Sequence, residues 1–171
     1  SNIFIYGGIN EKKVFLNDCW IYDLNIGKWS ILEFSGRYPP PLGHHCACLV
    51  LEKSQFNNDK LTVYHKSSAE RKTIPNLKTE GVFFFGGTND NRIPTNLFFQ
   101  MSIGLKPAIF EIPKINGKPP SPREDASMSF SQSISMIIIH GGKNDLKSEF
   151  YNDIYMMDLK TMDWIHPLFG D

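Results

Sequence analysis

Short runs of apolar residues, each ending at a pair of glycines, recur along the chain. They cover residues 3–6, 82–85 and 137–140. Apolar runs of this length that end at turn residues are typical of buried strands. Glycine adopts positive φ and lets neighbouring backbones approach closely, so each pair predicts a tight turn at a crowded strand end. The glycines concerned are Gly7, Gly8, Gly86, Gly87, Gly141 and Gly142.

A second strand follows each glycine pair after a polar loop. Residues 17–24 match residues 152–159, and in both copies a Trp stands six residues after an Asp. The middle copy keeps residues 96–99 but lacks the Tyr-Asp pair and the Trp. We therefore interpret the chain as three copies of one repeat, the middle one degenerate. The further motif residues are Tyr22, Asp23, Trp29, Asp158 and Trp164.

These features resemble the kelch repeat, whose signature is a diglycine, an aromatic-Asp pair, and a Trp six residues after the Asp. The resemblance covers nearly the whole chain except residues 52–80. It implies an all-β fold, a kelch-type β-propeller segment of about three four-stranded antiparallel blades. Leu42 and Asp125 depart from the pattern, because they stand where the repeat usually has Arg and His.

We expect one propeller segment over residues 1–171, with the innermost strand of blade one absent. Propellers need about four to eight blades to close a ring. We therefore favour a fragment of a longer propeller, and two alternatives stay open: a homodimer that completes the ring, or a partner chain that supplies the rest. The expected blades are blade one at 3–33, blade two at 44–113 with an insertion at 52–80, and blade three at 125–168.

The insertion is expected to be a mobile surface loop, since a few residues would suffice for this turn. A docking or phosphorylation segment at Ser67 or Ser68, ahead of Arg71 and Lys72, is the alternative.

Composition narrows the class of partner. The 171 residues hold 18 Lys plus Arg and 18 Asp plus Glu, a formal net charge of zero. This balance argues against a nucleic-acid or anionic-membrane partner, which a basic excess would favour. No apolar run reaches the ~20 residues of a membrane span. The odd count of 3 cysteines and the lack of any Asn-x-Ser/Thr sequence favour a reducing, cytoplasmic location.

The strongest candidate for metal chemistry is the segment His44-His45-Cys46-Ala47-Cys48. Zinc usually takes two separated pairs of ligands, and the sequence has no second pair, so we interpret the segment as structural and expect no metal or cofactor. Nucleophile elbows, phosphate loops and HExxH sequences are absent. Galactose-oxidase-like propellers need a Tyr-Cys cofactor with two histidines, and no such pattern matches. The chain is therefore expected not to be an enzyme.

The loops on one face are the best candidates for function. In antiparallel blades the b–c loops and d–a links share a face, and loops on a rigid scaffold commonly carry binding sites. We expect a non-catalytic scaffold for a protein or peptide partner, as the kelch resemblance also implies. Alternatives are a module of a larger phosphatase-linked or ubiquitin-ligase adaptor protein, or a galactose-oxidase-like enzyme. The expected contact residues are Arg37, Arg92, Arg123, Lys118, Lys143, Asn89 and Asn144.

Overall fold

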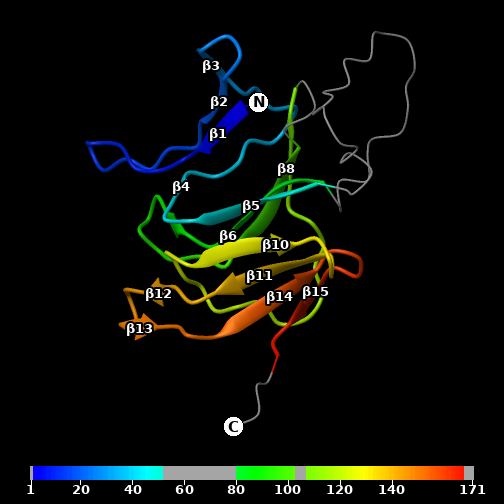
Figure 1. Ribbon diagram of the computed structural model, residues 1–171. Coiled ribbons are helices and arrows are strands. Elements are labelled where there is room, and N and C mark those ends of the chain that lie inside the picture. The colour runs from blue at the N-terminus through cyan, green and yellow to red at the C-terminus, as the bar shows by residue number, and fades with distance from the viewer. Residues whose placement is uncertain (1, 52–79, 103–106, 168–171) are drawn as a thin grey trace.

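The computed structural model describes residues 2–51, 80–102 and 107–167 (Figure 1). These residues form strands, turns and loops without a helix, so no described segment is a helix able to cross a membrane. Three antiparallel sheets follow one another in chain order and lie from top to bottom in Figure 1. The prediction of an all-β propeller segment is confirmed.

The first sheet has three strands in the order β1-β2-β3. Its second and third strands are joined by a turn at Gly27, whose N–H donates to the carbonyl of Asp23 at 2.8 Å. Positive φ at this glycine (65°) lets the chain reverse there. The strands are β1 (Asn2–Tyr6), β2 (Cys19–Asp23) and β3 (Lys28–Ile31).

The second and third sheets each have four strands in up-and-down order, β5-β6-β8-β9 and β10-β11-β14-β15. Their innermost strands, β5 and β10, lie side by side (Figure 1). The second sheet comprises β5 (Cys46–Val50), β6 (Gly81–Phe85), β8 (Phe98–Ser102) and β9 (Ile109–Glu111). The third comprises β10 (Ser127–Ser131), β11 (Met136–His140), β14 (Ile154–Asp158) and β15 (Asp163–Ile165).

Two short ladders lie in segments that the sequence predicted as plain loops. One joins the link before β5 to the loop after β6, with Leu42 opposite Asn89 and Gly43 opposite Thr88. The other closes a small hairpin between β11 and β14. Two-residue strands are too short to show any hydrophobic period, so the pattern could not predict them. They are β4 (Leu42–Gly43), β7 (Thr88–Asn89), β12 (Lys143–Asn144) and β13 (Glu149–Phe150).

The core lies in two layers between the sheets. Successive side chains of a strand point to opposite faces, so β6 contributes to both layers. Phe84 packs with Tyr6 and Phe99 against the first sheet, with ring centroids 5.1 and 4.8 Å from its own. Phe83 and Phe85 point the other way, into the layer that contains Trp164. All five residues of β6 are buried, as are all five residues of β8.

The first sheet leaves one apolar face uncovered by described residues. The register places Ile5 opposite Trp20 and Trp20 opposite Ile31, so these side chains share the face that points away from the second sheet. Exposed apolar patches are typical of surfaces that take part in association. Its large exposed side chains are Ile3, Ile5, Trp20, Trp29 and Ile31.

Most of the long insertion expected at 52–80, including Ser67, Ser68, Arg71 and Lys72, lies outside the described residues. Its expected mobility and docking role stay predictions.

Candidate partner-binding site

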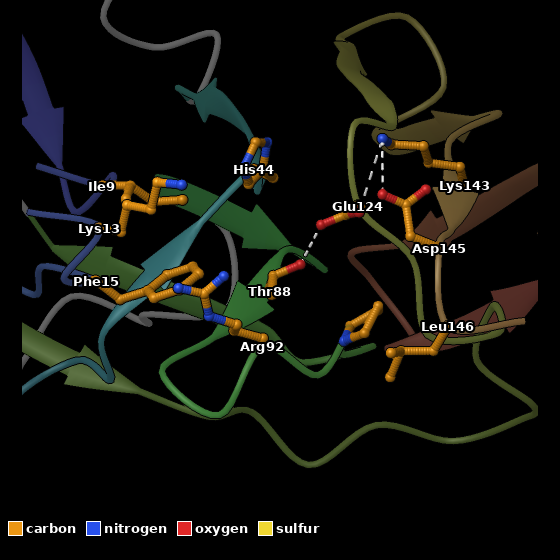
Figure 2. Close-up of a pocket in the computed structure, with 11 residues that line it drawn as sticks. Ile9, Lys13, Phe15, His44, Thr88, Arg92, Glu124, Lys143, Asp145 and Leu146 are labelled. Atoms are coloured by element: carbon orange, nitrogen blue, oxygen red, sulfur yellow. Dashed lines mark hydrogen bonds and ion pairs between the residues drawn. The ribbon is translucent and has the colours of Figure 1, made fainter. Parts of the chain in front are cut away.

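A pocket of about 420 Å³ opens between the loops that follow the three glycine pairs (Figure 2). The loops after β1, β6 and β11 each contribute to it, and the segments just before β5 and β10 complete the wall. Its lining residues are Ile9, Lys13, Phe15, His44, Thr88, Arg92, Pro94, Glu124, Lys143, Asp145 and Leu146.

The first two loops have the same backbone geometry, set by an asparagine. The side-chain oxygen of Asn10 accepts hydrogen bonds from the N–H groups two and four residues further on, both at 3.0 Å. Asn89 does the same in the second loop, again at 3.0 Å. The residue three places after each asparagine adopts a left-handed conformation, with φ of 59° at Lys13 and 60° at Arg92. Both loops thereby present a basic side chain at the same place.

The opposite wall carries a cluster of charged side chains that form ion pairs with one another. The ammonium of Lys143 lies 3.1 Å from Asp145, 3.5 Å from Asp125 and 3.9 Å from Glu124. The hydrogen bond between Lys143 and Asp145 raises the pKa of the lysine and lowers that of the carboxyl. Thr88 donates a hydrogen bond to the buried carboxylate of Glu124. This wall therefore has little unneutralised positive charge to offer a ligand.

Lys13 and Arg92 form no ion pair within the described part of the chain. Figure 2 shows them beside Phe15, on the side of the pocket away from Lys143 and Asp145. Ile9 and Pro94 add apolar surface to the same lining. The pocket thus combines two unpaired cations with an apolar wall.

Two of the expected contact residues, Arg92 and Lys143, lie in this pocket. Asn89 lies beside it and organises the second loop. Arg37 and Lys118 are exposed but do not line the pocket. Lys13 also lines the pocket but was not among the expected contact residues. Its distance from the glycine pair matches that of Arg92, and this repeat was the signal that could have indicated it.

Arg123 corrects the expectation of a surface arginine, because it is 1% exposed. Its Nη1 and Nη2 donate to the two carboxylate oxygens of Asp153 at 2.5 and 2.9 Å, and Nη1 also donates to the carbonyl of Gly141 at 2.9 Å. Its guanidinium lies 4.0 Å from the ring centre of Tyr151. Asn144 is likewise buried, and its Nδ2 donates to the carbonyl of Pro122 at 3.0 Å. Both side chains therefore bond within the fold, in contrast to the exposure expected of them.

The histidine- and cysteine-rich segment is divided between different environments. His44 lies 3.1 Å from Asp125 at the pocket, whereas the ring of His45 packs 4.9 Å from that of Tyr6. The thiol of Cys46 donates to a backbone carbonyl at 3.4 Å, and burial raises the pKa of Cys46 and of Cys48 to about 12. Across residues 2–51, 80–102 and 107–167, no group of three metal-capable side chains gathers as a metal site.

The repeat residues have structural roles. The rings of Tyr22 and Trp29 lie 4.9 Å apart across β2 and β3. The carboxylates of Asp23 and Asp158 each accept a hydrogen bond at 2.8 Å from the N–H two residues further on, which fixes the turn to the outermost strand. Trp164 contacts Phe85 and Phe98 in the second core layer.

Comparison with known proteins agrees with the resemblance to the kelch repeat. A sequence model of the kelch motif matches residues 1–33. The dynein alpha chain of the flagellar outer arm of Chlamydomonas reinhardtii is 25% identical over 172 residues, which covers 96% of this chain and 3% of that protein. Kelch domain-containing protein 1 from Mus musculus and from Homo sapiens is 21% and 22% identical, over 96% of this chain and 40% of each relative. The chain therefore spans well under half the length of these relatives. The kelch motif at residues 1–33 and the two kelch-domain relatives support the resemblance of this chain to the kelch repeat.

Proposed function

We propose that this chain is a non-catalytic kelch module that binds a protein partner through the loops after its glycine pairs. The pocket between these loops would receive one acidic side chain of the partner. Kelch repeats generally mediate protein–protein interactions, and this general role supports the proposal. The observation that carries it is the pair of cations, Lys13 and Arg92, which two equivalent turns hold at one pocket without a partner among the described residues.

An acidic side chain fits this wall chemically. The guanidinium of Arg92 can bind a carboxylate through two parallel hydrogen bonds, and Lys13 adds a second positive charge. The apolar surface of Ile9, Phe15 and Pro94 can pack the aliphatic stem of the same side chain. Because asparagine-centred turns fix the backbone beneath both cations, less conformational entropy is lost on binding.

The opposite wall would limit the number of acidic groups. A second carboxylate on the ligand would approach Glu124 and Asp145, which carry the same charge. Like charges brought together oppose binding, and such repulsion is a common source of specificity. We therefore expect the site to prefer one acidic residue flanked by polar or apolar ones over a run of acidic residues.

The test uses fluorescein-labelled peptide pools in which one Glu is flanked by varied neutral residues, with matched pools carrying Gln. Fluorescence polarisation with the 171-residue chain should show tighter binding of the Glu pools, and the difference should shrink with salt because the contact is ionic. Lys13→Glu with Arg92→Glu should abolish the preference. Arg37→Glu with Lys118→Glu alters two exposed basic residues outside the pocket and should leave it unchanged. Equal binding of Glu and Gln pools would refute the proposal.

The relatives also support a second proposal, that residues 1–171 act within a longer protein. This chain matches 40% of kelch domain-containing protein 1 and 3% of the dynein alpha chain. An antibody against residues 1–171 should then detect a native protein well above 19.5 kDa. We also propose a cytoplasmic location. The same antibody, applied to fractionated cells, should then detect the protein in the cytosolic fraction.

The source of the remaining blades is also a proposal: we favour further blades in the same chain over a homodimer. Light scattering of residues 1–171 after size exclusion should then give one chain mass of 19.5 kDa. Twice that mass would favour the homodimer.

A further inference from the structure

The two walls of the pocket carry opposite charge. On one wall, Lys13 and Arg92 form no ion pair within the described residues. On the other wall, Lys143 lies among acidic side chains. Figure 2 shows Lys13 and Arg92 on one side of the pocket and Lys143 with Asp145 on the other. The charge of the lining therefore changes sign across the pocket.

The acidic wall has more carboxylates than its ammonium can neutralise. The carboxylates of Glu124, Asp125 and Asp145 lie 3.9, 3.5 and 3.1 Å from the ammonium of Lys143. These four groups together have a formal charge of −2. His44, whose Nδ1 lies 3.1 Å from Asp125, adds one positive charge when it is protonated. The wall therefore stays formally negative in either state of this histidine.

The two walls do not neutralise each other. Among the residues that the structure describes, no ion pair joins Lys13 or Arg92 to Glu124 or Asp145, although all four line the same pocket. Opposite charges held apart in this way create a field across the pocket. A ligand that carries one charge of each sign is complementary to that field, whereas a ligand with one sign alone leaves one wall without a partner.

The size of the pocket limits the spacing of these two charges on a peptide. A sphere with the pocket's volume of about 420 Å³ is roughly 9 Å across, a small ligand pocket. In an extended peptide, residues two positions apart lie about 6.6 Å from each other and their side chains point to the same face. Adjacent side chains point to opposite faces, and residues four positions apart are separated by about 13 Å. A spacing of two positions therefore fits the pocket best.

The acidic wall also offers apolar surface to the stem of a basic side chain. Leu146 lines the pocket directly after Asp145 in the chain and is 68% exposed. The methylene groups of an arginine can pack on such a surface while its guanidinium reaches a carboxylate. The side chains of Asp125 and Asp145 are 46% and 62% exposed, so a ligand can reach both carboxylates.

We infer that the partner segment carries an acidic and a basic residue two positions apart. The acidic residue would contact Lys13 and Arg92, and the basic residue would contact Asp125 and Asp145. This inference rests on the proposed function, because it takes the acidic contact from it and adds the second one. Arginine suits the second contact better than lysine, since its guanidinium can bind a carboxylate through two parallel hydrogen bonds.

The test compares labelled peptides that hold Glu and Arg two positions apart, in both orders, with peptides in which neutral citrulline replaces Arg. Fluorescence polarisation with the 171-residue chain should show about three- to tenfold tighter binding of the Arg peptide in at least one order. Placing Arg directly beside Glu should reduce this preference, because the two side chains then point to opposite faces.

A matched pair of variants locates the basic residue. Asp125→Asn with Asp145→Asn removes two charges of the acidic wall, and asparagine tolerates the left-handed conformation of residue 125, whose φ is 55°. This variant should lose the preference for Arg over citrulline. It should keep the preference for Glu over Gln, which reports that the opposite wall is intact. Glu33→Gln with Glu111→Gln alters two exposed acidic residues outside the pocket and should leave both preferences unchanged.

Two outcomes would overturn this inference and leave the proposed function standing. One is equal binding of the Arg and citrulline peptides while Glu still binds more tightly than Gln. The other is a preference for Arg that survives in the variant with both asparagines, which would place the basic residue elsewhere. Equal binding of Glu and Gln peptides to the unaltered chain would instead refute the proposed function, and this inference with it.

Discussion

The guanidinium of Arg123 holds the carboxylate of Asp153 through two hydrogen bonds, at 2.5 and 2.9 Å, although the arginine is 1% exposed. A charge so deeply buried is tolerated only when it is paired and hydrogen-bonded. The remaining contacts, to the Gly141 carbonyl and to the face of Tyr151, meet that condition. The pair therefore fastens the inner strand of the third sheet to the strand that follows Asp153.

Replacing one partner of this pair should be costly. Arg123→Leu leaves the Asp153 carboxylate without its cation, and breaking a buried ion pair typically costs about 3–5 kcal/mol. Urea unfolding followed by tryptophan fluorescence should show a loss toward the lower end of that range, because Asp153 keeps 25% of its side-chain surface exposed. In the second sheet Leu42 and Leu97 hold the corresponding positions, four residues before β5 and directly before β8. Arg123→Leu with Asp153→Leu, which copies this apolar pair, should recover part of the loss. A double variant no more stable than the single one would contradict this reading.

The second glycine of the middle pair should tolerate no side chain. A Cβ at Gly87 would lie 2.6 Å from the carbonyl oxygen of Gly43 and 2.8 Å from the Cβ of His45, and its φ is 87°. Gly87→Ala should therefore destabilise the chain by backbone strain of about 1–2 kcal/mol plus a steric cost. Gly8→Ala is the matched control, since Gly8 has a similar φ of 99° with nothing within 4 Å. Equal losses of unfolding free energy in the two variants would exclude the steric contribution.

Much of the fold could be predicted from the sequence because its strongest signals are local. The run 82–85 before Gly86 and Gly87 gives both the strand and its end, and β6 spans Gly81–Phe85. The position of Arg123 could not be obtained in this way. An arginine in a proline-rich connector looks exposed, and only the approach of Asp153 and Gly141, far along the chain, provides the partners that let it be buried.

The pocket was predicted only in part, for a related reason. The sequence marks Arg92 and Lys143 as basic residues in loops, but only the folded chain shows that Lys143 is surrounded by carboxylates while Arg92 is not. The left-handed conformation of Arg92 recurs at Lys13, so the two basic residues hold equivalent places in their loops. Charge alone could not separate these roles, since the balance depends on contacts between three loops.

The three cysteines should react slowly in the folded chain. Burial raises the pKa of Cys19, Cys46 and Cys48 to about 12, so little of any thiol is present as the reactive thiolate near neutral pH. With Ellman's reagent at neutral pH, we expect reaction at least about a hundredfold slower than in urea, where the burial is lost. All 3 thiols should titrate in urea. Rapid reaction of any thiol in the folded chain would contradict this expectation.

His45 should make the chain less stable in mild acid. Burial against Tyr6 and Phe84 lowers its pKa from 6.5 to about 4, and its Nδ1 has no hydrogen-bond partner in the described structure. Between these pH values the unfolded chain binds a proton at this residue and the folded chain does not, so acidification favours unfolding. The stabilisation is complete above about pH 6.5 and is lost progressively toward pH 4, on the order of 3 kcal/mol in all.

Urea unfolding midpoints measured at intervals across this pH range give the slope directly. His45→Phe keeps a ring between Tyr6 and Phe84 and removes the titrating group, so its slope should be much flatter. The charge of His44 also lowers the pKa of His45, so His44→Gln should give a slope somewhat shallower than that of the unaltered chain but steeper than that of His45→Phe. If His45→Phe lost stability with acid as steeply as the unaltered chain, another group would have to titrate in this window, and the assignment to His45 would be wrong.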